Sequence, residues 1–151
     1  METSQIGRLL LERGLIDHQQ LDQLTQKQRY AERPADELAA EMFDLRQWEI
    51  WQACAAALIR DCPMTNLCRE RADAQCLSLV SAQEAWQMLV MPLRMEAGEL
   101  VCATTEETLP QALALMHHRV DVPVRFVISE IRLLEQFIAE RYGYEGVELA
   151  N

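Results

Sequence analysis

Apolar side chains recur at three- and four-residue intervals through the first sixty residues, which is the spacing of one side of a helix. The first such group, Ile6, Leu9 and Leu10, is followed by Gly14, which can adopt the left-handed conformation that ends a helix. Gly7 lies inside this first helix, where a glycine costs about 1 kcal/mol relative to alanine. A glycine there indicates the close approach of another backbone or of a ligand.

A second helix is predicted directly after Gly14. Asp17 and Gln20 have the spacing of a capping box, and Ile16 and Leu21 are placed as its hydrophobic staple. Residues 5–28 are therefore expected to form two short helices joined at a glycine corner.

The next thirty residues repeat this pattern with changes. Arg33-Pro34-Ala35 starts the repeat, Leu38 takes the place of Leu10, and alanine replaces the first glycine. Glu41 or Met42 stands where the corner glycine stood, and Asp44 with Gln47 has the capping-box spacing. A fourth helix is predicted over residues 45–60. Its Trp48 and Trp51 are expected to be largely buried, with one of them as an apolar wall for a base as the alternative.

After residue 88, apolar side chains recur at every second position, which is the spacing of one face of a strand. Residues 89–95 and 100–103 alternate around the turn Glu96-Ala97-Gly98 and predict a hairpin, whose Pro92 favours an edge strand. Residues 122–128 alternate as a third strand. A helix with a capping box at Thr108 and Gln111 precedes that strand.

A last helix, capped by Ser129 and ended by Gly143, follows the third strand. Residues 72–86 are expected to hold a short helix and a link. The expected fold class is α+β: a helical subdomain of two tandem helix pairs over residues 1–62, and a small three-stranded sheet with helices on one face over residues 63–151.

Charge narrows the range of partners. The chain has 24 acidic and 14 basic side chains, a net charge of −10, which argues against binding DNA or RNA. Residues 1–34 hold five of each sign, whereas residues 35–110 hold thirteen acidic and five basic side chains. An anionic ligand is therefore repelled least at the N-terminal end.

Several kinds of chemistry are not indicated. The five cysteines lack metal-ligand spacing and are typical of reduced cytosolic thiols. No apolar run approaches the roughly 18 residues of a membrane span, and the N-terminus lacks the pattern of a signal peptide, so the expected compartment is the cytoplasm without membrane insertion. Lys27 has no phosphate-binding glycine loop around it, and His117 and His118 have no third ligand. We expect no enzyme, no metal site and no cofactor.

Residues 5–28 resemble a known family. Gly7, Leu10, Gly14, Leu21 and Gln28 are similar to the first tandem motif of the MshEN domain, found in type II secretion and type IV pilus assembly ATPases and attached to membrane glycosyltransferases. The resemblance implies an N-terminal helical part that contains two copies of the motif, followed by a small α/β part. It also implies binding of cyclic di-GMP, a regulatory ligand with two guanines and two phosphates.

Both motif copies depart from the family pattern. Gln5 replaces the arginine that opens the first copy and Thr25 replaces a leucine, whereas the second copy keeps Arg33 but lacks both glycines. In the predicted site, glycines allow backbone approach, Leu10 and Leu38 cover the bases, and Arg8 and Arg33 supply charge. The predicted ligand-binding residues are Gln5, Ile6, Gly7, Arg8, Leu10, Leu11, Gly14, Leu21, Gln28, Arg33, Pro34, Ala35 and Leu38.

Two functions follow from this sequence. The first is a non-catalytic domain that binds cyclic di-GMP and regulates a fused or docked secretion, pilus or polysaccharide machine, which can hold it at the inner face of the membrane. The second is a docking adaptor of the same fold that binds a protein partner and no nucleotide. The retained glycines favour the first function, and the eroded second copy favours the second.

Overall fold

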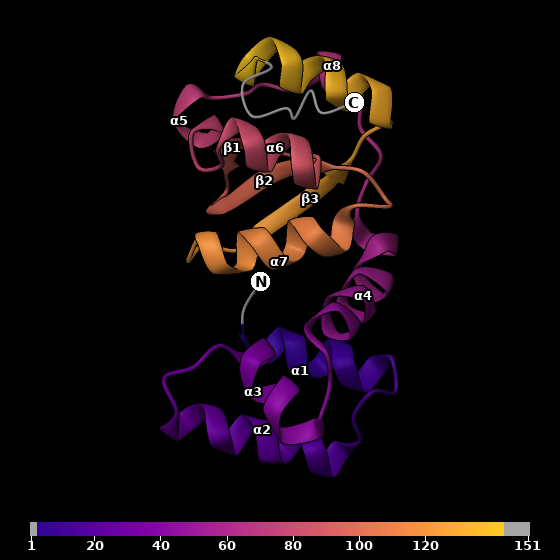
Figure 1. Cartoon of the computed structure of the whole chain (residues 1–151), viewed down its shortest axis with the longest axis vertical. Helices are drawn as coiled ribbons and strands as arrows, with labels where there is room; N and C mark the ends of the chain where they lie inside the picture. Colours follow the sequence, from indigo (N-terminus) through magenta and orange to yellow (C-terminus); the bar gives the residue numbers. More distant parts are fainter. Residues whose placement is uncertain (1–2, 144–151) are drawn as a thin grey trace. The chain divides into compact units, whose positions relative to one another are not determined.

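The computed structural model describes residues 3–143 (Figure 1). They divide into two compact units, with the boundary between Arg60 and Asp61. Over the described residues, the chain forms eight α-helices and one three-stranded sheet. The fold class is α+β, as predicted.

The first unit consists of four short helices, as predicted, and no strand lies between residues 5 and 60. The helices are α1 (Thr3–Glu12), α2 (His18–Tyr30), α3 (Ala35–Phe43) and α4 (Gln47–Leu58). α1 packs against the other three helices. Because the apolar residues of each helix share one side, they meet in a common core. That core includes Ile6, Leu9, Leu10, Ile16, Leu24, Leu38, Ile50 and Trp51.

The first corner has the predicted geometry. Gly14 has a φ of 77°, and the Leu15 amide donates to the Leu10 carbonyl at 3.0 Å, which closes the end of α1. Asp17 Oδ1 accepts from the Gln20 amide at 2.7 Å, and Gln20 Oε1 accepts from the Asp17 amide at 2.9 Å. The capping box that begins α2 is therefore confirmed.

The second corner lies later in the chain than predicted. Asp44 has a φ of 52° and ends α3, with the Leu45 amide donating to the Ala40 carbonyl at 3.1 Å. The N-cap of α4 is Arg46, whose amide donates to Glu49 Oε1 at 3.3 Å. The predicted capping box of Asp44 and Gln47 is wrong, as is the corner at Glu41 or Met42. Aspartate tolerates the left-handed conformation better than most residues, so α3 continues until Asp44 is reached.

The second unit is built around a sheet with the order β1-β2-β3. Its strands are β1 (Val90–Glu96), β2 (Glu99–Thr104) and β3 (Val124–Ile128), with β1 antiparallel and β3 parallel to β2. Ala97 and Gly98, at φ 53° and 80°, form the tight turn between β1 and β2. The hairpin and the edge position of Pro92 are confirmed.

Helices cover both faces of this sheet, not one face as predicted. They are α5 (Ala74–Leu77), α6 (Ala82–Met88), α7 (Leu109–Arg119) and α8 (Ile131–Tyr142), with short 3₁₀ turns at Ile59–Asp61 and Leu67–Arg69. Figure 1 shows α7 on one side of the strands and α6 and α8 on the other. Every residue from Leu100 to Thr104 on β2 is buried, which requires cover on both faces.

Two predicted helix starts also differ from the structure. Thr108 precedes α7, but its hydroxyl lies 2.6 Å from the Thr105 hydroxyl and does not cap the helix. Glu130, not Ser129, caps α8, with its Oε2 accepting from the Leu133 amide at 3.1 Å. Ser129 is buried, and its amide donates to the Thr104 carbonyl at 2.8 Å, so it continues the pairing of β3 with β2. Gly143 ends α8 as predicted.

Candidate functional site

All the residues predicted to bind a ligand lie in the first unit, but they differ in exposure. Gln5, Arg8, Gly14 and Arg33 are exposed, whereas Leu11, Leu21, Gln28 and Pro34 are half-buried. The remaining five, Ile6, Gly7, Leu10, Ala35 and Leu38, are buried in the described structure. The exposed and half-buried members can touch a ligand without a change in the packing of the helices, whereas the five buried members cannot.

Leu10 and Leu38 cannot cover a base in this arrangement. Their exposed fractions are 0% and 1%, because both side chains belong to the core of the four helices. This corrects the role predicted for them. A leucine at helical spacing supports the packing of the motif, and any apolar contact with a ligand must come from other side chains.

Gly7 is explained by the packing of α1 on α2. A Cβ atom built at Gly7 would lie 2.6 Å from Leu21 Cδ1 and 3.5 Å from Leu24 Cδ2. Glycine therefore lets the side chains of α2 approach the backbone of α1. The close neighbours of Gly7 are thus leucine side chains of α2 and not another backbone, and the approach of a ligand to Gly7 stays a prediction.

The surroundings of Gly14 differ from those of Gly7. It is exposed, and a Cβ atom there would meet nothing within 4 Å. Its positive φ, not crowding, accounts for the glycine. The corner therefore leaves backbone accessible at the end of α1.

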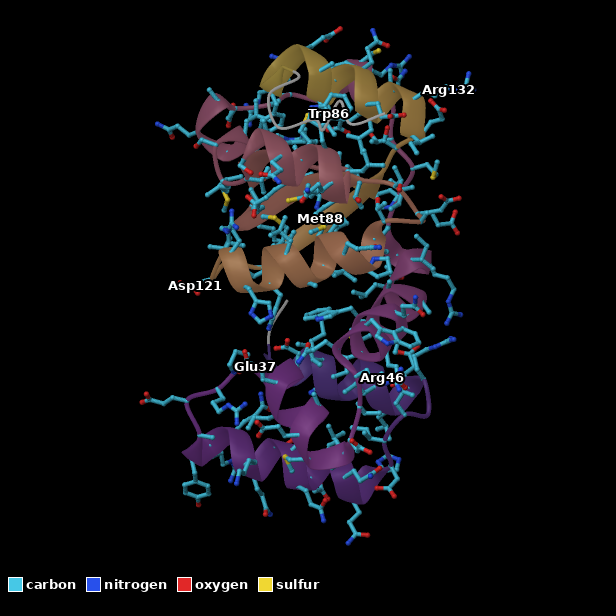
Figure 2. All side chains as sticks on the ribbon, in the orientation of Figure 1. Glu37, Arg46, Trp86, Met88, Asp121 and Arg132 are labelled. Carbon is cyan, nitrogen blue, oxygen red and sulfur yellow. The ribbon has the colours of Figure 1, made fainter. Side chains whose placement is uncertain are left out.

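The Arg33 guanidinium is already paired with carboxylates of α3. Its Nη1 and Nη2 donate to Glu41 at 2.6 and 2.8 Å, and its Nε lies 3.7 Å from Glu37 Oε2, the glutamate labelled in Figure 2. The hydrogen bonds from Arg33 lower the pKa of the Glu41 carboxyl. Among the described residues, the exposed Arg8 side chain has no such partner. Of the two predicted arginines, Arg8 is thus the one with an open guanidinium.

A groove beside the first corner was missed by the sequence analysis. It has a volume of about 350 Å³, and we call it the Trp48 groove. Its lining residues are Arg13, Leu15, Trp48, Glu49, Gln52, Ala53 and Ala56. Trp48 is 56% exposed, so its predicted burial is wrong, whereas Trp51 is 5% exposed as predicted.

A further groove lies in the second unit and has a volume of about 420 Å³. Met88, Ala114 and Leu115 give it an apolar lining, and Arg119 lies at its rim, paired with Glu84 at 2.6 Å. His117 and His118 are in edge contact with ring centroids 5.1 Å apart. Within residues 3–143, no group of three or more histidine, cysteine or acidic side chains is arranged to hold a metal ion.

The cysteines are unreactive where they are buried. All five are free thiols, and burial raises the pKa of the Cys54 thiol to about 12 and that of Cys102 further still. The thiolate is the reactive form of cysteine, so these two side chains are inert packing residues.

No helix in the described part of the chain is long and apolar enough to cross a membrane.

Comparison with known proteins gives one family match. The family model of the MshEN domain matches residues 60–148, more than half of the chain. This confirms the family expected from residues 5–28, although the matched segment is the second unit and does not include those residues. A search of curated proteins finds no match.

The solved structures that are similar to the chain include the following two. One, described as MshE with cdg, is 22% identical with a TM-score of 0.47 and covers 91% of this chain and 97% of its own. The other, the N-terminal domain of XpsE, is 15% identical with a TM-score of 0.47 and covers 94% and 97%. On the family match over residues 60–148, the chain belongs to the MshEN domain family.

Proposed function

We propose that this chain is a non-catalytic regulatory domain whose helical unit binds cyclic di-GMP. The domain then passes the signal to a fused or docked secretion, pilus or polysaccharide machine. Membership of the MshEN family supports a regulatory or docking role, and cyclic di-GMP is the ligand that the first motif copy implies. In this proposal, a protein partner holds the domain at the inner face of the membrane.

The observation that carries the proposal is the open corner at Gly14. Exposed backbone at a left-handed glycine can approach a phosphate closely, because no Cβ atom stands in the way. Arg8 and Gln5 are exposed on α1, the helix that ends at this corner. Arginine pairs with the acceptor edge of guanine through two parallel hydrogen bonds, so Arg8 is the group assigned to a base.

Weak binding is expected because of two features of the site. Gln5 stands where the family has an arginine, so one charged donor is absent. Arg33 must leave Glu41 before it can bind a ligand, and Glu37 adds negative charge beside it. A charge-assisted hydrogen bond contributes about 1.5–3 kcal/mol, so the missing donor weakens binding about ten- to hundred-fold.

Calorimetric titration of cyclic di-GMP into the full chain tests the proposal. Gln5→Arg should strengthen binding, whereas Arg8→Ala and Arg33→Ala should weaken it. Arg29→Ala is the matched control, because Arg29 is an exposed arginine on α2 that is not in the predicted site. Glu41→Gln should also strengthen binding, since it releases the Arg33 guanidinium. If neither the parent nor Gln5→Arg gives heat or a thermal shift at a ligand excess of millimolar order, nucleotide binding is excluded.

The second candidate function is protein docking without a nucleotide. Two observations favour it: the two carboxylates that hold Arg33, and the exposed Trp48 on a grooved surface. A large exposed aromatic side chain is typical of protein interfaces. If neither the parent nor any of the variants above binds cyclic di-GMP, docking remains as the function of the helical unit.

A further inference from the structure

The Trp48 groove combines an apolar floor with hydrogen-bond donors that have no partner. Leu15, Ala53 and Ala56 supply the apolar surface, and the indole of Trp48 stands exposed beside them. Within the described residues, the Arg13 guanidinium and the Trp48 indole N–H make no hydrogen bond or ion pair. These features come from α4 and from the corner between α1 and α2, and together they line one groove.

The charged side chains of the groove indicate what kind of ligand it binds. The chain as a whole carries a net charge of −10, yet Arg13 remains without a carboxylate partner in the described structure. Glu49, which also lines the groove, accepts a hydrogen bond from the Arg46 amide at the start of α4. An occupant with a carboxylate satisfies Arg13, and an apolar side chain next to that carboxylate fits against the indole and the alanines.

The size of the groove limits the contact to a short segment. Its volume of about 350 Å³ is at the small end of the range for ligand sites, enough for one or two side chains. A nucleotide with two phosphates would meet one arginine here and the carboxylate of Glu49 beside it. A peptide with a single carboxylate matches this charge more closely.

We propose that the Trp48 groove binds a short acidic segment of a partner protein, in which an apolar side chain lies next to an aspartate or glutamate. The apolar side chain packs on Trp48, Ala53 and Ala56, and the carboxylate pairs with Arg13. This site goes beyond the cyclic di-GMP function, because the residues that carry it are not those assigned to the nucleotide.

Selection from a displayed library of random short peptides tests the site. The immobilised full chain captures peptides after the library has been depleted on the double variant Arg13→Glu/Trp48→Ala. The enriched peptides should share an acidic residue beside a large apolar residue. Enrichment of basic or charge-independent sequences, or no enrichment at all, would overturn the proposal.

Affinities of the enriched peptides, measured by fluorescence anisotropy, then locate the contact. Arg13→Glu and Trp48→Ala should each weaken binding about tenfold or more, as for side chains at the centre of an interface. Arg29→Glu and Tyr30→Ala are matched controls, since both residues are exposed on α2 and do not line the groove. Thermal unfolding of the variants checks that the fold is retained.

Replacing the peptide's carboxylate by its amide should weaken binding to the parent and leave binding to Arg13→Glu nearly unchanged. A loss of equal size in both would show that Arg13 does not pair with the carboxylate and would overturn the assignment. Displacement of the peptide by cyclic di-GMP would show that the groove belongs to the nucleotide site. If cyclic di-GMP fails to bind the chain but the peptides behave as expected, the groove stands and the nucleotide function alone fails.

Discussion

Trp48 and Trp51 lie three residues apart on α4, yet their surroundings are opposite. The buried side of this helix contains Ile50, Trp51 and Cys54, and Trp48 lies on its first turn outside that side. Three-residue spacing places two side chains about 60° apart around a helix, which is enough to separate a core position from an exposed one. The sequence pattern therefore identified the helix but could not say where its buried side ends.

The difference predicts unequal effects of truncation. Trp51→Ala should lower the free energy of unfolding by about 3–5 kcal/mol, as for large side chains removed from a core. Trp48→Ala should lower it by less than about 1 kcal/mol, because an exposed side chain loses little packing. Urea denaturation of both variants, followed by circular dichroism, provides the measurement. Equal losses would mean that Trp48 is also part of the core.

The candidate site shows the same limit of sequence reasoning at single residues. Gly14 was correctly assigned to a left-handed corner, since the helix end is a local property of the chain. Leu10 and Leu38 were wrongly assigned to ligand contact, because burial depends on how four helices pack together. The Trp48 groove was missed for that reason too, since its lining comes from the first corner and from α4.

At the scale of elements, the corners of the two helix pairs in the first unit differ in the residue that adopts the left-handed conformation. The first corner has a glycine at positive φ, and the second has Asp44, a residue with a Cβ atom, at φ 52°. For most residues the left-handed conformation costs roughly 1–2 kcal/mol, and glycine avoids that cost. The repeat is thus retained in the backbone although its second glycine is gone.

Glycine substitutions test where the second corner lies. Asp44→Gly should stabilise the chain by up to about 1 kcal/mol, because it relieves the strain of the positive φ. Met42→Gly should destabilise it by about 1 kcal/mol, because residue 42 lies inside α3. Urea midpoints for the two variants decide between the positions. The reverse order of stability would place the corner at residue 42, where the motif spacing predicted it.

An ion pair joins α6 to the end of α7 in the second unit and predicts a pH dependence. Glu84 accepts from Arg119 at 2.6 and 2.9 Å, and this pairing is the main reason that the pKa of the Glu84 carboxyl falls from its ordinary value of 4.5 to about 2. Because the pKa is lowered in the folded state, the stabilisation is present above pH 4.5 and is lost as the pH falls toward 2.

Glu84→Gln isolates this ion pair. Glu84 also accepts from the Ser81 amide at 2.9 Å, and a glutamine can keep that cap while it removes the charge. The variant should lose about 1 kcal/mol or less at pH 7, since both side chains are partly exposed to solvent. Unfolding free energies of parent and variant should converge as the pH is lowered through the range below 4.5. A constant difference across that range would contradict the assigned cause of the pKa shift.

At the scale of the whole molecule, the order of helices and strands could be predicted from the sequence. The placement of helices on both faces of the sheet could not. Alternation along residues 89–103 and 122–128 gave all three strands, since period two is a property of each strand alone. The sequence did not reveal that β3 runs parallel to β2. That parallel connection requires a crossover, which lays α7 on one face and leaves the other face to α6 and α8. On that second face, the indole N–H of Trp86, labelled in Figure 2, donates to the Gly143 carbonyl at 2.9 Å. This hydrogen bond links α6 to the end of α8.

The two compact units each have an apolar core of their own, which predicts that they unfold separately. Residues 1–60 bury side chains such as Leu10 and Trp51, and residues 61–151 bury the sheet beneath its helices. The first unit is the smaller one, and a smaller domain buries a smaller fraction of its surface on folding. We therefore expect the helical unit to unfold at a lower denaturant concentration than the sheet unit.

Single-tryptophan variants can follow each unit, because the chain has three tryptophans. Trp48→Phe/Trp86→Phe leaves Trp51 as the reporter of the helical unit, and Trp48→Phe/Trp51→Phe leaves Trp86 as the reporter of the sheet unit. In urea, the Trp51 signal should change at a lower midpoint than the Trp86 signal, and Asp44→Gly should raise the first midpoint alone. Circular dichroism of each double variant, compared with the parent, separates the order of unfolding from damage by the substitutions themselves. Coincident midpoints in both variants, moved together by Asp44→Gly, would show that the two units fold as one cooperative structure.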